Sequence, residues 1–404
     1  MKRFIPMLLG LTLAAANCTT NSTLLSDTAA SLGGASSASG SGTSTTTSGS
    51  KLWVVGGTSG ALSAALSTVL SYSPDTNAWT TETTSGTYTP VSFAAYARYG
   101  TKIYVFGGFN AAGTAVSTTQ IFDTSTLAWS TGGALPAAMA HGSAVVVGTK
   151  ILVLGGTSVN AATAWAVSTM NALYDPATDT ATAQTALGGT TGQGSDKCAV
   201  ADGTAVIHNT ARTAAATITA ATQAFFLNAG LATATPTTTT LGTTLTNRSG
   251  MACVLYSPGS AGNSNFILAI GGLTANTANT GGFVGGANNT AGGAGTLTAW
   301  TSVTTVQNLA APYTGAWGTS LALPTATSFA GAAILNNVLY VVGGNTGTAA
   351  AQNIQATTNV YAASLSANGT SAPFLGWSAN KPGTSTALQA LPVARWGHGL
   401  IAIP

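Results

Sequence analysis

Charged side chains are scarce in this chain of 404 residues, because Asp, Glu, Lys and Arg together make up only 5 % of it. Glu82 is the single glutamate, the aspartates are scattered, and no basic run or stripe occurs. The absence of basic clusters argues against a nucleic-acid partner. The shortage of carboxylates leaves little material for an enzyme that works by general acid–base catalysis.

Histidine and cysteine are also rare, with three of each. No HxxxH or HExxH spacing occurs, so the sequence predicts no metal site and no cofactor. His141 and His398 follow two Leu-Pro pairs by five and six residues, which indicates that they belong to a repeat. Cys198 and Cys253 lie in equivalent strands of successive units, where a disulfide and two buried free thiols both remain open.

Long hydrophobic runs are missing, with one exception near the start. A basic beginning precedes an apolar run from Phe4 to Ala16, which is too short to span a bilayer and is typical of an export signal. Ala15-Ala16-Asn17-Cys18 resembles a bacterial lipoprotein box, although most such boxes have Gly or Ala where Asn17 stands. The resemblance implies that residues 1–18 are a signal peptide ending at Cys18, which is lipidated. Cleavage after Ala16 with plain secretion is the alternative.

Residues 19–50 consist mainly of Ser, Thr, Gly and Ala, with Asp27 as their single charge. This composition cannot bury a core, so it predicts a disordered tether between the signal and the rest of the chain. The sequence therefore predicts a lipoprotein that a membrane holds in the periplasm or on the surface of a bacterial cell.

Glycine, in contrast, is abundant, and pairs of it end five apolar strands. They read LWVVGG, IYVFGG, ILVLGG, ILAIGG and LYVVGG at 52–57, 103–108, 151–156, 267–272 and 339–344. A sixth, degenerate copy, AVIHN at 205–209, contains His208 and fills the double-length gap in the series. A strand end that recurs about 50 residues apart predicts a ring of repeated sheets. Glycine suits this place because it permits a positive φ and a close approach of another backbone.

Further features recur within the units. Tyr72 precedes Trp79 by seven residues across a turn, the next unit repeats this spacing, and Leu135-Pro136 is one of three Leu-Pro pairs. Together with the glycine pairs, these residues resemble the kelch repeat family over residues 51–404. The resemblance implies an all-β fold, a six-bladed kelch-type β-propeller with about four antiparallel strands in each blade.

The two ends of the repeat region complement each other. The last Leu-Pro pair is followed by one strand, at 396–404, whereas the first glycine-pair strand, at 52–57, has no strand before it. We therefore predict that the C-terminal strand pairs beside Leu52–Gly57 and closes the ring. Closure of this kind removes the free sheet edges at which β-proteins aggregate.

One unit is longer than the others because of a Gly/Asn-rich insertion at 273–299. Long loops often carry function, so this insertion is either an adaptable binding loop or a segment that has drifted without a role.

The expected function is that of a non-catalytic binding module for a protein or a glycan, acting as a monomer. The candidate ligand-binding residues are Arg395, Trp396 and His398, which cluster in one segment after a Leu-Pro pair. A packing role at the edge of a blade is the alternative for all three.

Two classes of enzyme share the repeat. Galactose-oxidase-like enzymes need Tyr and His copper ligands and a Cys-linked Tyr, and no set of residues here matches them. Six-bladed sialic-acid mutarotases need acid–base and Arg groups at the ring axis. Arg98, Arg212, Arg248 and Arg395 are available, but Glu82 stands alone. A carbohydrate-directed enzyme or lectin of the mutarotase type is therefore the alternative function. Converging Arg, His and carboxylate groups at the axis would favour the enzyme, and Ala, Ser, Thr and Gly would favour a scaffold.

Overall fold

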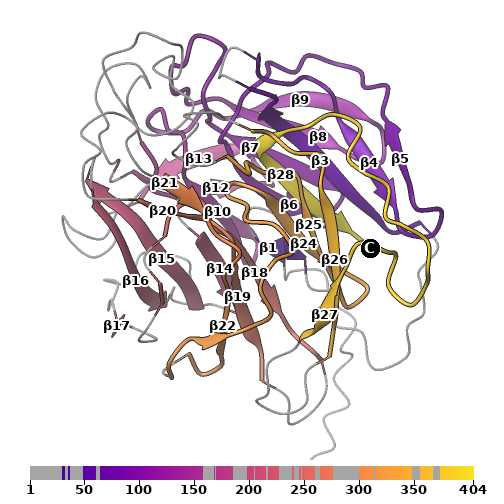
Figure 1. The fold of residues 1–404 in the computed structure, drawn as a ribbon. Coiled ribbons are helices and arrows are strands. Elements are labelled where there is room, and N and C mark those ends of the chain that lie inside the picture. Colours follow the sequence, from indigo (N-terminus) through magenta and orange to yellow (C-terminus); the bar gives the residue numbers. More distant parts are fainter. Residues whose placement is uncertain are drawn as a thin grey trace, which may run out of the picture.

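A computed structural model gives the fold for most of the predicted head and for two short pieces before it (Figure 1). The structure describes residues 30–31, 35–36, 49–60, 64–157, 168, 170–184, 198–203, 205–214, 217–226, 239–240, 245–246, 248–259, 264–275, 300–313, 315–347, 355–366 and 374–404. Among these residues, no helix has both the length and the apolar character that crossing a membrane requires.

The described residues form six four-stranded antiparallel sheets, which are the blades of a propeller (Figure 1). From the axis outward, the strands are β28 (Trp396–Ile403), β3 (Lys51–Thr58), β4 (Leu70–Ser73) and β5 (Ala78–Thr81) in blade 1; β6 (Ala95–Tyr99), β7 (Lys102–Phe106), β8 (Thr119–Asp123) and β9 (Ala128–Gly132) in blade 2; β10 (Ser143–Val147), β11 (Lys150–Leu154), β12 (Asn171–Asp175) and β13 (Thr180–Ala183) in blade 3; β14 (Cys198–Asp202), β15 (Ala205–Ala214), β16 (Thr217–Phe226) and β17 (Thr239–Thr240) in blade 4; β18 (Ala252–Tyr256), β19 (Phe266–Ile270), β22 (Val306–Ala310) and β23 (Gly318–Thr319) in blade 5; and β24 (Gly331–Leu335), β25 (Val338–Val342), β26 (Val360–Leu365) and β27 (Phe374–Ser378) in blade 6. The prediction of six blades is confirmed.

Two further pairs of strands lie outside the blades. β20 (Leu273–Ala275) pairs with β21 (Trp300–Ser302), and β1 (Ala30–Ser31) pairs with β2 (Ala35–Ser36). The first of these pairs lies at the two ends of the inserted segment, whose residues 276–299 fall outside the described part of the chain.

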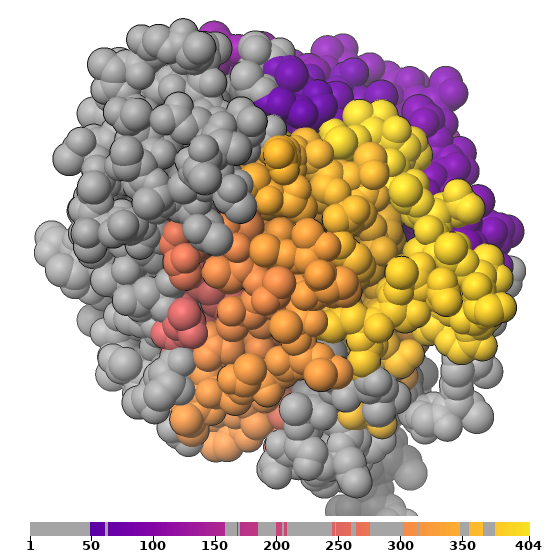
Figure 2. Space-filling model, in the orientation of Figure 1, coloured from indigo at the N-terminus to yellow at the C-terminus, as the bar shows by residue number. Residues whose placement is uncertain are grey.

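The ring is closed by the C-terminal strand, as predicted. β28 pairs antiparallel with β3 in a register that joins Ile403 to Lys51 and Gly399 to Val55. Figure 2 shows the yellow C-terminal residues beside the indigo and purple residues of the first two blades. The first blade is therefore built from both ends of the head, so that each blade is held by two neighbours.

The glycine pairs form joints between successive blades, and both of their residues have a positive φ. Gly107 and Gly108 illustrate the geometry: the N–H of Gly108 donates to the carbonyl of Met139 in the next blade over 2.7 Å. A Cβ on Gly107 would overlap that same carbonyl oxygen. The equivalent inter-blade bonds in the other described joints are Gly57 to Val91 (3.1 Å), Gly272 to Thr327 (2.9 Å) and Gly344 to Arg395 (2.8 Å).

The repeat aromatics fill the spaces between the blades. Tyr72 and Trp79 are direct cross-strand neighbours, and so are Phe122 and Trp129, with ring centroids 5.0 Å apart in both pairs. Trp129 is buried and also stacks on Tyr88 at 4.1 Å. Large rings of this kind bury much apolar area and stabilise the contact between blades.

Blade 4 confirms that the degenerate copy is a structural unit. The segment AVIHN lies in β15, which takes the same second position in its sheet as the glycine-pair strands do in theirs. β15 and β16 have ten residues each and pair as far as Ala214 with Thr217, so the hairpin continues where the other blades have a joint.

Candidate functional site

A belt of backbone hydrogen bonds surrounds the ring axis at the end where the glycine pairs lie. Its five described members stand two residues before the inner strand of a blade and have φ between 52° and 62°; they are Phe93, His141, Gly250, Phe329 and Gly397. Phe93 donates to Gly397 over 2.8 Å, Gly397 to Phe329 over 3.1 Å, Phe329 to Gly250 over 2.8 Å, and His141 to Phe93 over 2.8 Å. We call these five residues the axial belt. A positive φ in Phe or His carries strain, and the bonds between blades offset it here.

The side chains of the axial belt gather over the axis. Phe93 is central: its ring stacks on His141 at 4.3 Å and meets Phe329 at 5.5 Å and Trp396 at 4.9 Å. Phe109 packs against His141 from the side at 5.4 Å. All five rings are buried, so they close this end of the axis with an apolar plug. Where a belt member is glycine, a ring takes its place: Phe93 covers Gly397, and Phe329 covers Gly250.

A cavity of about 110 Å³ lies at the axis next to these rings, and every blade contributes to its lining. Most of the lining side chains are small; they come from Ala94, Ala95, Ser143, Ala199, Ala252, Cys253 and Ala330. The polar groups are those of Ser143, Tyr96, His141 and His398. Among the described lining residues there is no carboxylate, arginine or lysine. The cavity can therefore bind through shape and a few hydrogen bonds, but it holds no described acid–base pair.

Arg395 and Trp396, two of the three predicted ligand-binding residues, are buried in contacts within the ring. The guanidinium of Arg395 donates from Nη1 to the carbonyls of Gly56 and Thr68, both over 3.3 Å, and from Nη2 to Oγ1 of Thr68 over 2.9 Å. Trp396 donates from Nε1 to the carbonyl of Gly60 over 3.1 Å. These contacts fit the packing role that was the alternative, and a ligand-binding role for this segment remains a prediction.

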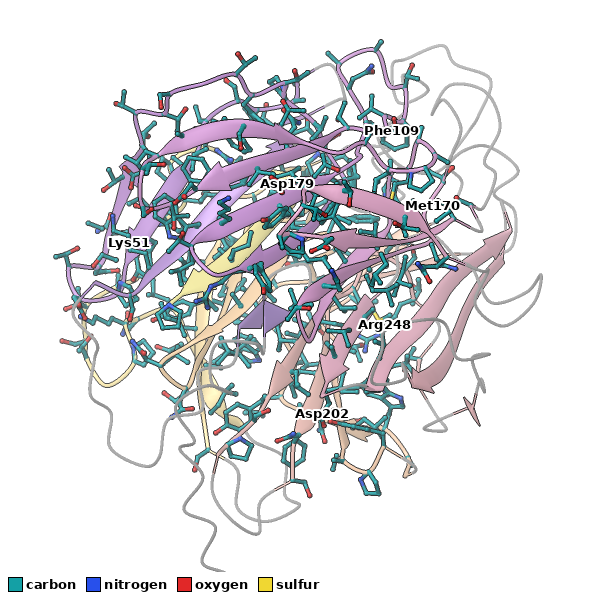
Figure 3. The ribbon with its side chains drawn as sticks, turned by 180° about the vertical axis from the view of Figure 1, so that it is seen from behind. Lys51, Phe109, Met170, Asp179, Asp202 and Arg248 are labelled. Atoms are coloured by element: carbon teal, nitrogen blue, oxygen red, sulfur yellow. The ribbon has the colours of Figure 1, made fainter. Side chains whose placement is uncertain are left out.

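Arg248 takes the same place in blade 5 that Arg395 takes in blade 1, and it too lies within the packed strands (Figure 3). Its Nη1 donates to the carbonyls of Gly271 over 2.8 Å and Thr305 over 2.6 Å, and its Nη2 to Oε1 of Gln307 over 3.0 Å. Burial lowers the pKa of both guanidinium groups to about 10. Each arginine thus fixes the first glycine of a joint to the loop that follows it.

His398, the third predicted residue, borders the cavity but lies mostly within the joint between blades 6 and 1. A Cβ on Gly343 would lie 2.8 Å from Cε1 of His398, so the ring occupies the space that this glycine leaves. Burial, together with the nearby charge of Arg395, lowers the pKa of His398 to about 3. The imidazole is therefore neutral at ordinary pH, and it is poorly suited to act as a general acid.

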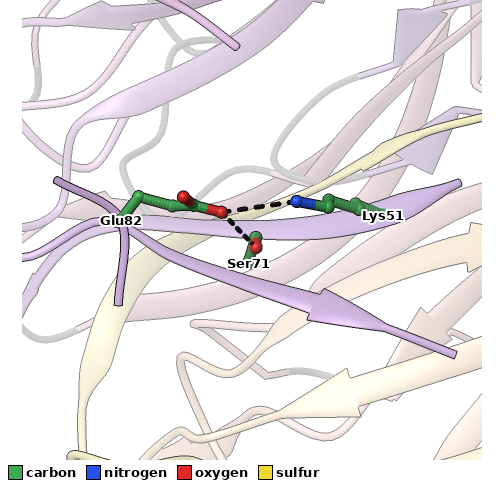
Figure 4. A network of polar contacts seen from close by, with 3 residues as sticks. All are labelled: Lys51, Ser71 and Glu82. Atoms are coloured by element: carbon green, nitrogen blue, oxygen red, sulfur yellow. Dashed lines mark hydrogen bonds and ion pairs between the residues drawn. The ribbon is translucent and has the colours of Figure 1, made fainter. Parts of the chain in front are cut away.

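The single glutamate lies away from the axis. Glu82 accepts from Oγ of Ser71 over 2.5 Å and pairs with Nζ of Lys51 at 3.5 Å (Figure 4). These residues border a hollow of about 320 Å³ between blades 1 and 2, which Trp53 and Leu127 also line. Trp53 is buried and meets Phe122 edge-on at 5.6 Å, so its ring face is not presented to a ligand.

The other candidate residues are widely separated or outside the described side chains. Arg98 donates from Nε to the carbonyl of Gly100 over 2.9 Å on the exposed side of blade 2. Cys253 is disulfide-bonded, which decides between the two alternatives for this thiol. Cys18 and the side chains of Cys198, His208 and Arg212 lie outside what the structure describes. Within the described residues, no group of three or more His, Cys, Asp or Glu side chains could hold a metal ion.

Sequence reasoning did not find the axial belt. A signal was present, because Ser-Phe-Ala occurs at 92–94 and again at 328–330, directly before an inner strand in both cases. His141 and His398 also proved not to be equivalent: the first is a belt member, whereas the second lies one residue beyond it in the repeat.

Comparison with known proteins agrees with this architecture. The model of the KLHDC2/KLHL20/DRC7 Kelch-repeats domain matches residues 42–272, which is more than half of the chain. The solved structure described as "Structure of YjhT" is similar to this one with a TM-score of 0.54 and 15 % sequence identity, over 74 % of this chain and 88 % of that chain. At this identity the similarity concerns the fold. The comparison with curated proteins gave no match.

Proposed function

Because this chain belongs to the kelch-repeat family, whose rings of blades present loops and an axial cavity, we propose that it is a non-catalytic binding module for a protein or a glycan. One observation carries the proposal: the described lining of the axial cavity is dominated by Ala, Gly, Ser and aromatic side chains. A binding site needs shape, aromatic surface and a few polar contacts, whereas an acid–base enzyme needs titratable groups that reach the substrate.

The position of the charged groups supports this proposal. Glu82 is engaged by Lys51 and Ser71 at the side of the ring. Arg248 and Arg395 donate their hydrogen bonds to carbonyl, amide and hydroxyl oxygens of their own blades. These groups therefore serve the scaffold, and none of them is directed at the axial cavity.

Two histidines at the cavity, His141 and His398, favour the second candidate, a carbohydrate-directed enzyme or lectin of the mutarotase type. The two candidates differ in what they do to a sugar. A binding module leaves the rate of anomer interconversion unchanged, and an enzyme accelerates it.

The test uses the purified full chain on a glycan array and, separately, in polarimetric assays with aldoses and sialic acid. The expected result is binding of a glycan or peptide without accelerated mutarotation. Ala199→Leu, which fills the cavity, should abolish the binding, while Thr80→Leu on the exposed part of β5 should leave it intact. Accelerated mutarotation that Ala199→Leu removes would overturn the proposal in favour of the enzyme.

We further propose that the protein is exported and held at a membrane through a lipid on Cys18. The support is the apolar run that ends in Ala15-Ala16-Asn17-Cys18, followed by a polar segment. Metabolic labelling with a fatty acid should mark the wild-type chain and not Cys18→Ala, which should appear in the soluble fraction. A wild-type chain without label would show plain secretion instead.

A further inference from the structure

The inner strands of the blades form the wall of an axial channel. β28, β6, β10, β14, β18 and β24 each stand at one end of their sheet order, and each contacts the inner strands of the neighbouring blades. Each therefore has one edge with no strand of its own sheet beside it. Unpaired backbone N–H and C=O groups need partners, so these edges can accept another extended segment.

A short hairpin from the N-terminal segment lies in this channel. β1 and β2 pair through Ala30 with Ser36 and through Ser31 with Ala35. β1 contacts the inner strands β6 and β10, and β2 contacts β18, β24 and β28. Five of the six inner strands thus surround the hairpin, and Figure 1 shows β1 at the middle of the ring.

The sequence of this segment suits such a position. Residues 30–36 read ASLGGAS, so the strands consist of Ala and Ser, and a Gly-Gly pair stands in the connection between them. Glycines of this kind favour a tight hairpin turn. The segment carries no charge, so it can enter a channel lined by small side chains without burying an ionised group.

The connection between the hairpin and blade 1 is long enough. The chain enters β3 at Lys51, and Gly56 and the axial belt lie at the opposite end of that strand. An extended segment of 12 residues, the number from 37 to 48, spans up to about 40 Å. Since the buried rings of the belt close one end of the axis, the hairpin has to enter from the end at which β3 begins.

We propose that residues 30–36 are an intramolecular plug, which occupies the axial channel and closes the axial cavity on the side away from the belt. The occupant of the channel is then the chain itself, and a ligand of the cavity has to displace this hairpin. The plug does not depend on the proposed binding function, because it is a contact within one chain.

The test is amide hydrogen exchange on the purified full chain, followed by mass spectrometry of peptides. If the hairpin is seated, the amides of residues 28–38 exchange at least tenfold more slowly than those of 41–47, which have a similar composition. Exchange of both segments at the same, unprotected rate would overturn the proposal.

A matched pair of variants tests the seat of the hairpin. Gly33→Pro combined with Gly34→Pro should remove protection from 28–38 and speed exchange in β6, β10 and β24, with the outer strands unchanged. The control is Gly40→Pro with Gly42→Pro, which introduces the same residues outside the hairpin and should change neither region. Inner strands that exchange at wild-type rates after protection of 28–38 is lost would also overturn the proposal, because the hairpin would then not cover them.

Discussion

Blade 4 and the blades around it are joined in different ways. In the other five blades the strand next to the inner one ends in two glycines, and in four of these a bond from the second glycine to the next blade is described. In blade 4 that strand runs on through Asn209 and Thr210 into a long hairpin with β16. On the far side of this junction, in β18, Cys253 is disulfide-bonded.

The difference shows what the glycine pair is for. A joint needs two adjacent residues with positive φ and space for a carbonyl of the next blade, and only glycine meets both conditions without strain. Where the pair is missing, a covalent bond lies at the boundary. Drift of the repeat was tolerated in blade 4, and we interpret the disulfide as the constraint that takes over there.

Removal of the closing strand gives the largest expected effect, because it breaks every joint at once. Deletion of 391–404 takes away β28, which supplies the inner strand of blade 1 and the carbonyl that Gly344 donates to. The deletion variant should contain no cooperatively folded head, as judged by thermal melting and circular dichroism. A variant that melts cooperatively at the wild-type temperature would show that the ring does not need closure.

A single joint is tested by Gly107→Ala. A left-handed backbone costs about 1–2 kcal/mol in alanine, and the overlap with the carbonyl of Met139 adds about 1–3 kcal/mol. Gly100→Ala is the matched control, because Gly100 lies in the same blade with φ +62° and has open space around it. Denaturant unfolding should show a loss of about 2–5 kcal/mol for the first variant and only the backbone cost for the second. Equal losses would contradict the account of the joint.

Removal of the disulfide tests the other kind of boundary. Cys253→Ser should lower the free energy of unfolding by about 2–4 kcal/mol, as is typical for the loss of a native disulfide. Reduction of the wild-type protein should lower it by a similar amount, and reduction of the variant should have no further effect. If reduction leaves the wild-type stability unchanged, the disulfide does not carry this boundary.

Some of these features could be predicted from the sequence, and others could not. The blades and the closing strand leave a periodic record, since glycine pairs and Leu-Pro pairs recur at fixed places. The axial belt consists of bonds between backbone atoms, and Phe93 and Phe329 do not reveal a positive φ by their residue type. Arg395 looked exposed because its burial depends on carbonyls of Gly56 and Thr68, which are more than 300 residues away in the chain. The state of Cys253 depends on side-chain directions, which the repeat spacing does not contain.

The smallest expected effect concerns His398 in the joint between blades 6 and 1. Its pKa is about 3 in the folded protein against an ordinary value of 6.5, so between these values the unfolded chain binds a proton that the folded one does not. Stability from this group is therefore present above pH 6.5 and is lost as the pH falls toward 3, by about 1.4 kcal/mol for each pH unit. The measurement is denaturant unfolding between pH 6.5 and 4.5, where aspartates remain ionised. His398→Leu should reduce the slope of stability against pH by about that amount, whatever its effect on the absolute stability. A variant with the wild-type slope would show that His398 is protonated in the folded ring, and that its joint is open to water as those formed by glycine and carbonyl alone are not.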